Sequence, residues 1–190
     1  MGFEHRLVWL TGLSSFFDTM TINPERVLRV RERGTGFAQL MGELMDKRPI
    51  LLVMSNGGDV GRTLRALAKS EIQNEVVVAK DGVEALEYLF GKGKYDHRDP
   101  DELPSLVLLD LELPGIDGLG VLRQMRTSEL TKLVPVVVLT PPEGTLHLLR
   151  SYRLGANSCI RKASDPAEFS SAIQQVTSYW LHLNEPVIEI

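Results

Sequence analysis

The feature that most constrains the fold of this chain is an alternation of short apolar runs with amphipathic stretches, repeated five times after residue 49. The apolar runs are predicted as strands at residues 50–54, 75–79, 105–109, 134–139 and 157–160. The stretches that follow them are predicted as helices at residues 59–69, 82–90, 118–127, 145–153 and 166–183. Five strand–helix units in succession are typical of an α/β domain.

The strand candidates are apolar on both sides, which determines how the predicted sheet has to be covered. Val136 to Leu139 contains no polar residue, so a strand there needs helices on each face. Right-handed crossovers then connect parallel neighbours. We predict a flavodoxin-like, doubly wound five-stranded parallel sheet, (βα)5, with an N-terminal extension.

Several acidic residues stand directly before predicted helices and are interpreted as helix caps. Asp165 precedes Pro166 at the start of the last helix, and Asp81 and Asp117 each precede a glycine. A side-chain oxygen at this position accepts a hydrogen bond from a free backbone N–H of the first turn. We interpret Asp59 in the same way, as the cap of the first helix.

Polar residues stand where four of the five predicted strands end. Ser55 and Asn56 follow the first strand, Asp110 follows the third, Thr140 ends the fourth, and Lys162 follows the fifth. In open parallel sheets, ligands bind outside the carboxyl ends of the strands. We therefore expect Asp110, Thr140 and Lys162 to gather at one edge, with Asp110 as a candidate nucleophile.

Composition limits the function classes. A length of 190 residues with 43% hydrophobic content suits one domain plus an appendage. A net charge of -4 and a pI near 5.6 give no overall attraction to nucleic acid, so no nucleic-acid partner is expected. The single cysteine, Cys159, excludes an intramolecular disulfide and is interpreted as a buried structural thiol in a reducing compartment.

The N-terminal region carries no recognisable membrane signal. The apolar stretch Leu7 to Phe17 falls short of the roughly 20 residues that a membrane span needs, and no small-residue cleavage site follows it. Arg6 stands where a myristoylation signal needs Ser or Thr. We predict a cytoplasmic protein without membrane contact.

The regular pattern begins near residue 49 and divides the chain. Residues 1–48 are predicted as an extension, 49–186 as the main domain and 187–190 as a tail. Met45 stands just before the first strand, so residues 1–44 are hypothesised to result from an upstream start-site assignment. A short regulatory or docking helix is the competing hypothesis for the same segment.

Taken together, these motifs resemble bacterial response-regulator receiver domains, and among them the single-domain type associated with phytochrome-like histidine kinases. The resemblance covers about residues 49–186. It rests on Leu108 to Pro114 with Asp117-Gly118, Val136 to Thr140, Lys80 to Leu86, Ser151 to Leu154, and Tyr179 to Pro186.

The resemblance implies a role for each candidate residue. Asp110 would be the phosphoacceptor that takes a phosphoryl group from a histidine kinase. Thr140 would be the switch hydroxyl that hydrogen-bonds a phosphoryl oxygen, and Lys162 the cation that pairs with it. A receiver of this kind signals through protein contacts and is not an enzyme.

The chain departs from the family where the family binds metal. The acidic pair that normally ends the first strand is replaced by Met54 and Ser55. Mg²⁺ prefers hard oxygen ligands, and the remaining candidates are Asp110, Ser55, the Glu112 backbone carbonyl, and Asp59 or the Glu112 side chain as partial substitutes. Mg²⁺ binding is therefore expected to be weak or absent.

Two smaller departures point to a modified switch. Pro141 follows Thr140 where a small residue is usual, and Ala163 follows Lys162 where the family has proline. The prolines at 141 and 142 stiffen a loop that has to move towards phosphate. A slow phosphoacceptor and a phosphorylation-independent pseudo-receiver that only binds partners both remain open.

A flavodoxin-like enzyme or nucleotide binder is an alternative from another class, since the fold permits many activities. Gly57-Gly58 and Gly91 to Lys94 are the glycine-rich candidates, and neither matches a phosphate-binding or dinucleotide fingerprint. The four histidines show no zinc-ligand spacing.

Partners are predicted from the resemblance and from surplus apolar residues near the C-terminus. The kinase is expected to be phytochrome-like. Tyr179, Trp180 and Leu183 offer more apolar area than one helix stripe needs, so a homodimer is expected, with residues 184–190 embracing the second copy. The segment from Gly91 to Pro104 is interpreted as a solvated loop that could instead contact the kinase.

Overall fold

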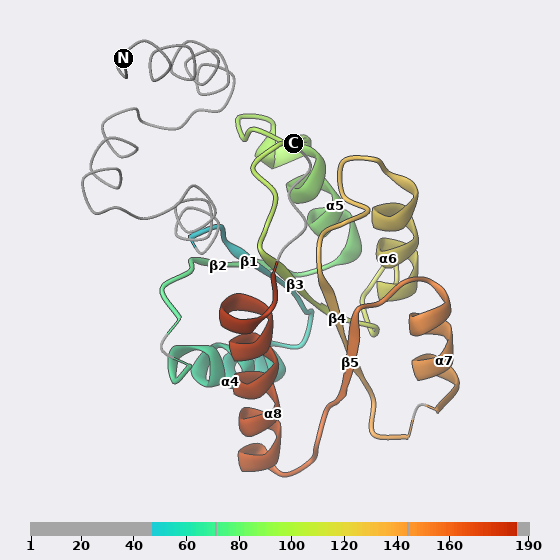
Figure 1. Cartoon of the computed structure of the whole chain (residues 1–190). Coiled ribbons are helices and arrows are strands. Elements are labelled where there is room, and N and C mark those ends of the chain that lie inside the picture. Colours follow the sequence, from blue (N-terminus) through green and yellow to red (C-terminus); the bar gives the residue numbers. More distant parts are fainter. Residues whose placement is uncertain (1–46, 71, 144, 186–190) are drawn as a thin grey trace, which may run out of the picture. The chain divides into compact units, whose positions relative to one another are not determined.

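Five parallel strands form one sheet in the order β2-β1-β3-β4-β5 (Figure 1). The computed structural model describes residues 47–70, 72–143 and 145–185. The predictions for residues 1–46 and for the tail at 187–190 lie outside this range. The strands are β1 (Ile50–Val53), β2 (Val76–Ala79), β3 (Leu106–Asp110), β4 (Val136–Thr140) and β5 (Ser158–Arg161).

Helices connect the strands, and their bounds agree closely with the predicted ones. They are α4 (Gly57–Ala68), α5 (Gly82–Phe90), α6 (Gly118–Thr127), α7 (Thr145–Arg153) and α8 (Pro166–Ser178), with a 3-10 turn η2 (Gly93–Tyr95) and a π-helical turn η3 (Tyr179–Leu183). The doubly wound five-stranded prediction is confirmed. The strand order reverses between β1 and β3, so this pair forms the topological switch point.

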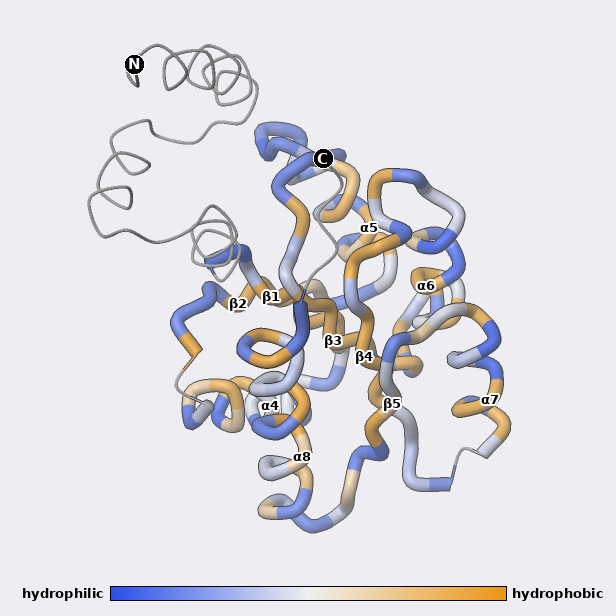
Figure 2. The backbone as a smooth tube through the Cα atoms, viewed as in Figure 1, coloured by the Kyte–Doolittle hydropathy of each residue, from blue (hydrophilic) through white to orange (hydrophobic). Residues whose placement is uncertain are grey.

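Alternate residues of each strand enter two apolar layers on opposite faces of the sheet. Leu51 and Val53 join the layer under α5 and α6, whereas Ile50 and Leu52 join the layer under α4 and α8. Figure 2 shows the strands as a mostly hydrophobic band, whereas hydrophobic and hydrophilic residues alternate along the helices. This two-sided burial is the physical reason that the strands carry almost no polar residue.

The caps of α5, α6 and α8 are as predicted, but that of α4 is not. Asp81, Asp117 and Asp165 each accept hydrogen bonds from first-turn N–H groups. For α4 the capping oxygen belongs to Asn56, which accepts from the backbone N–H groups of Gly58 and Asp59. The interpretation of Asp59 as the cap is therefore wrong, because the helix begins two residues earlier than predicted and leaves the Asp59 carboxylate free for other partners.

The C-terminal helix packs its apolar stripe on the sheet, and its backbone then changes to the wider π-helical geometry. Phe169 and Ile173 are buried in the layer under α4 and α8. After Ser178 the backbone changes to π geometry, and the Asn184 N–H donates to the Tyr179 carbonyl at 2.8 Å. This turn leaves Tyr179 and Leu183 exposed.

The segment after α5 is largely exposed, as predicted, yet it is anchored to the helix. Arg98 donates to the Tyr88 carbonyl at 2.8 Å, and its guanidinium lies 4.1 Å from the Tyr88 ring centroid. Tyr95 packs edge-on against the same ring. These contacts hold a long connection close to the body of the domain.

Two further predictions concern the burial of Cys159 and the presence of a membrane span. Cys159 is a free thiol on β5, and it is half-buried where full burial was expected. Within the residues that the structure describes, no helix combines the length and the apolar character needed to cross a membrane.

Candidate functional site

Asp110 is the last residue of β3, the central strand, and it emerges at the switch point. Its backbone pairs with Leu139 of β4, and its side chain is 1% exposed. A carboxylate at this depth needs hydrogen-bond donors or a cation, because burial without them costs several kcal/mol.

Lys162 supplies that cation from the segment after β5. Its Nζ lies 3.0 Å from Oδ1 and 2.9 Å from Oδ2 of Asp110, so both oxygens of the carboxylate are engaged. The Lys162 backbone N–H donates to the Thr140 carbonyl at 2.8 Å, which fixes the chain where it leaves β5. The side chain is only 12% exposed and covers Asp110.

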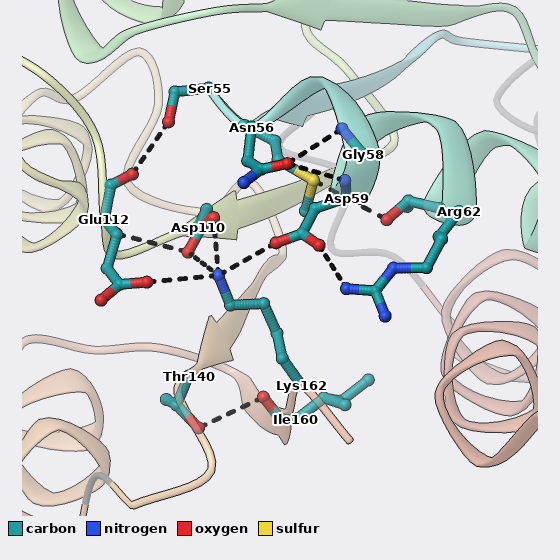
Figure 3. Close-up of polar contacts among 12 residues, drawn as sticks. Ser55, Asn56, Gly58, Asp59, Arg62, Asp110, Glu112, Thr140, Ile160 and Lys162 are labelled. Carbon is teal, nitrogen blue, oxygen red and sulfur yellow. Dashed lines mark hydrogen bonds and ion pairs between the residues drawn. The ribbon is translucent and has the colours of Figure 1, made fainter. Parts of the chain in front are cut away.

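Two more carboxylates approach the same ammonium group. Oδ2 of Asp59 lies 3.5 Å and Oε2 of Glu112 lies 3.6 Å from the Lys162 Nζ. Figure 3 shows the three acidic side chains converging on the Lys162 ammonium from α4, from β3 and from the turn after β3. Glu112 is 69% exposed, whereas Asp59 is 16% exposed, so water screens the Asp59 interaction less.

Burial and charge act together on the ionisation of the central pair. Burial raises the pKa of the Asp110 carboxyl, and the hydrogen bond and charge of Lys162 offset only part of that rise. For Lys162, burial by itself lowers the pKa, but Asp110 and then Asp59 and Glu112 outweigh it and leave the pKa raised. The ammonium group therefore remains charged at neutral pH.

Thr140 lies at the end of β4, the strand next to β3, and is also buried, but its hydroxyl does not bond Asp110. It donates to the Ile160 carbonyl of β5 at 3.3 Å (Figure 3). Asp110 and Lys162 thus come into contact as predicted, while the Thr140 hydroxyl is bonded to the sheet.

The residues after β1 differ in their surroundings. Met54 is fully buried in the layer under α4 and α8, where the Thr63 hydroxyl lies 3.8 Å from its sulfur. Ser55 is exposed and donates its hydroxyl to the Glu112 carbonyl at 3.1 Å. The Glu112 N–H in turn donates to Oδ1 of Asp110 at 3.3 Å.

These residues do not fit a tightly held Mg²⁺ ion. The Met54 thioether is a soft ligand and points into the core, Ser55 offers a neutral hydroxyl, and the Lys162 ammonium already lies among the carboxylates. Among the described residues, no group of three or more His, Cys, Asp or Glu side chains is arranged to hold a metal.

Arg62 is part of this cluster and was missed by the sequence analysis. It forms an ion pair with Oδ1 of Asp59 three positions earlier in α4, and its guanidinium lies 5.6 Å from the Phe169 ring centroid. The i,i+3 spacing of an acidic and a basic residue on one helix was the available signal.

The comparisons with known proteins agree with this architecture. Residues 51–174 match the response regulator receiver domain family. Response regulator Rcp1 of Synechocystis sp. is 33% identical over 132 residues, which cover 70% of this chain and 88% of Rcp1.

Solved structures of similar proteins include two phytochrome response regulators. The phosphorylated cyanobacterial phytochrome response regulator RcpA is 32% identical with a TM-score of 0.69, over 75% of this chain and 99% of RcpA. The bacteriophytochrome response regulator AtBRR is 47% identical with a TM-score of 0.60, over 73% of this chain and 99% of AtBRR. The chain belongs to the response regulator receiver domain family and is a two-component response regulator related to those of phytochromes.

Proposed function

We propose that Asp110 is the phosphoacceptor of this receiver domain, which spans residues 49–186, and that the donor is a phytochrome-like histidine kinase. A carboxylate oxygen of Asp110 forms the new bond to phosphorus, and the bond between phosphorus and the kinase histidine nitrogen breaks. The observation that carries the proposal is the contact of Lys162 with both Asp110 oxygens at the switch point of the sheet.

Lys162 and Thr140 have distinct parts in this proposal. The ammonium group of Lys162 pairs with the negatively charged oxygens of the transferring phosphoryl group, the kind of fixed charge that stabilises such a transition state. Thr140 is the switch hydroxyl. To reach a phosphoryl oxygen, it has to give up its bond to the Ile160 carbonyl, and Pro141 restricts the loop that moves with it.

We further propose that phosphorylation of this chain depends little on Mg²⁺. Receiver domains typically use the ion, and Rcp1 has been solved in a Mn²⁺-bound form. In this chain Met54 and Ser55 stand where the family has its acidic pair, and the Glu112 carbonyl already accepts the Ser55 hydroxyl. Lys162 then supplies the cationic charge next to Asp110, and we expect transfer to be slow.

The test is the intact mass of the protein after acetyl phosphate treatment, with and without Mg²⁺, next to an Asp110→Asn variant. We expect an added phosphoryl mass in the natural chain under both conditions and none in the variant. An addition that persists in Asp110→Asn would assign the phosphoacceptor to another residue. An addition that requires Mg²⁺ would overturn the metal-independent part of the proposal.

A phosphorylation-independent pseudo-receiver is the second candidate function. Its supporting observation is the coverage of Asp110 by Lys162, which leaves the carboxylate 1% exposed. No phosphoryl addition under any condition, together with kinase binding that is unchanged in Asp110→Asn, would favour it.

A homodimer is proposed as the signalling form. Tyr179 and Leu183 on η3 are 48% and 74% exposed, and Leu146, Leu149 and Tyr152 on α7 are also exposed. Apolar area of this kind is a recurrent mark of protein interfaces. Sedimentation of the full chain at micromolar concentration is expected to give a dimer, and a monomer would contradict the proposal.

A further inference from the structure

The Asp59 carboxylate is placed between two cations, and neither contact serves the helix cap. Asp59 is the third residue of α4, whose N-terminal N–H groups are satisfied by Asn56. One oxygen of Asp59 pairs with Arg62, and the other lies 3.5 Å from the Lys162 ammonium. Its side chain is 16% exposed.

The Lys162 ammonium blocks the route to Asp110 for as long as it stays in this position. Both Asp110 oxygens face it at 2.9–3.0 Å, so an incoming phosphoryl group has to displace the ammonium from at least one of them. Any group that holds Lys162 in place therefore opposes that displacement. Asp59 is the less exposed of the two additional carboxylates that do so.

The charges around Asp110 also oppose the approach of a phosphoryl donor. The cluster contains three carboxylates, Asp110, Asp59 and Glu112, and two cations, Lys162 and Arg62. A phosphoryl donor is itself anionic, so each unneutralised carboxylate near Asp110 raises the energy of its approach. Without tight metal binding, Lys162 is the cation on which the transfer depends.

We propose that Asp59 is a positioning residue that holds the Lys162 ammonium on Asp110 and thereby slows phosphorylation, and that Arg62 weakens this hold by sharing the Asp59 carboxylate. The inference rests on the proposed phosphoacceptor role of Asp110. It assigns to this acidic residue of α4 a rate-setting function that acts through Lys162.

The test compares initial rates of acetyl phosphate labelling in the full chain and in single and double variants. Asp59→Asn is expected to be faster by about 5-fold, because Lys162 loses one anionic partner and the site loses one negative charge. Arg62→Gln is expected to be slower by about 2-fold or more, because Asp59 then pairs with Lys162 alone. In the Asp59→Asn background, Arg62→Gln should have no further effect.

Matched variants control for changes in helix stability. Glu168 is the third residue of α8, as Asp59 is of α4, and it is exposed, so Glu168→Gln should leave the rate unchanged. Arg65→Gln, on an exposed position of α4, is the control for Arg62→Gln. Asp59→Glu keeps the negative charge and should therefore be phosphorylated almost as slowly as the natural chain.

A second readout does not need phosphorylation. Labelling of Lys162 by a small amine-reactive acetylating reagent, followed by peptide mass spectrometry, should be faster in Asp59→Asn than in the natural chain and unchanged in Glu168→Gln. Unchanged labelling of Lys162 in Asp59→Asn would overturn the inference. So would a slower phosphorylation rate in Asp59→Asn, above all if stimulation by Mg²⁺ were lost with it, because Asp59 would then act as a metal ligand.

If the natural chain accepts no phosphoryl group, the proposed function fails. The labelling rate of Lys162 then decides separately whether Asp59 positions it.

Discussion

The Lys162 ammonium contacts both oxygens of the Asp110 carboxylate, at 3.0 and 2.9 Å, although the two residues are 52 positions apart in the chain. The parallel register of β3, β4 and β5 brings them together, because it aligns the carboxyl ends of the three strands. The pair is both the centre of the site and a buried ion pair, so its loss is expected to affect stability as well as chemistry.

Replacing Lys162 by Met should destabilise the domain at neutral pH. Asp110 would remain as a buried carboxylate without its cation, and removal of one partner of a buried pair costs about 3 kcal/mol. Urea unfolding at pH 7 measures this loss. The double variant Asp110→Asn with Lys162→Met should lose clearly less stability than Lys162→Met alone, since it leaves no buried charge. Equal losses in the single and the double variant would show that the two residues are not coupled.

The rate of Asp110 phosphorylation should fall as the pH is lowered, with a midpoint above the ordinary 3.8 of an aspartate side chain. Burial raises the pKa of this carboxyl, so it takes up its proton at a higher pH than an exposed aspartate does. The protonated form is a poor nucleophile. Initial rates are measured with two donors, acetyl phosphate and a phosphoramidate, so that ionisation of Asp110 can be separated from ionisation of the donor. A midpoint at or below 3.8 with both donors would contradict the prediction.

Gly118 should not tolerate a side chain. A Cβ atom at this first residue of α6 would lie 2.2 Å from the Asp110 carbonyl oxygen and 2.8 Å from the Leu111 Cα, both backbone atoms. Gly118→Ala is therefore expected to cost about 2 kcal/mol and to slow phosphorylation, because the chain directly after β3 has to shift.

Gly57 is the matched control, since it is the first residue of α4 and a Cβ atom there would meet nothing within 4 Å. Gly57→Ala should leave the unfolding free energy within about 0.5 kcal/mol of the natural value. A similar loss in both variants would refute the steric explanation.

Arg126 is expected to stabilise the end of the sheet opposite the site. Its guanidinium donates to the carbonyls of Gly155 and Val134 and to the side-chain oxygen of Asn157, at 2.8, 3.0 and 2.7 Å. In Arg126→Met the Gly155 and Val134 carbonyls lose this donor, while the Asn157 oxygen keeps its hydrogen bond from the Val136 N–H. The change should cost about 2 kcal/mol of unfolding free energy. Arg123→Met, on an exposed position of the same helix, should change the unfolding free energy by less than about 0.5 kcal/mol. Similar losses in the two variants would show that the hydrogen bonds of Arg126 do not stabilise the domain.

The fold could be predicted from the sequence because its signals are local. The two-sided apolar character of runs such as Val136 to Leu139 predicted a covered parallel sheet, and Asp81, Asp117 and Asp165 marked their helix starts correctly. The start of α4 was missed because Asp59 was interpreted as its cap, whereas Asn56, three residues earlier, is the cap in the structure. Gly57-Gly58 between them has weak helix propensity. Only the backbone path decides which of the two side chains faces the free N–H groups.

The amino-acid sequence was enough to predict that Asp110, Thr140 and Lys162 lie at the same edge of the sheet, because position along a strand follows from apolar periodicity. The direction of their polar atoms depends on packing between distant segments: the Lys162 ammonium lies among three carboxylates, and the Thr140 hydroxyl donates to the Ile160 carbonyl. An ammonium group has no preferred partner among carboxylates of equal charge, so its choice depends on distances set by the packing of α4, β3 and β5. Those distances arise from contacts between segments about 50 residues apart, and no local pattern in the chain encodes them.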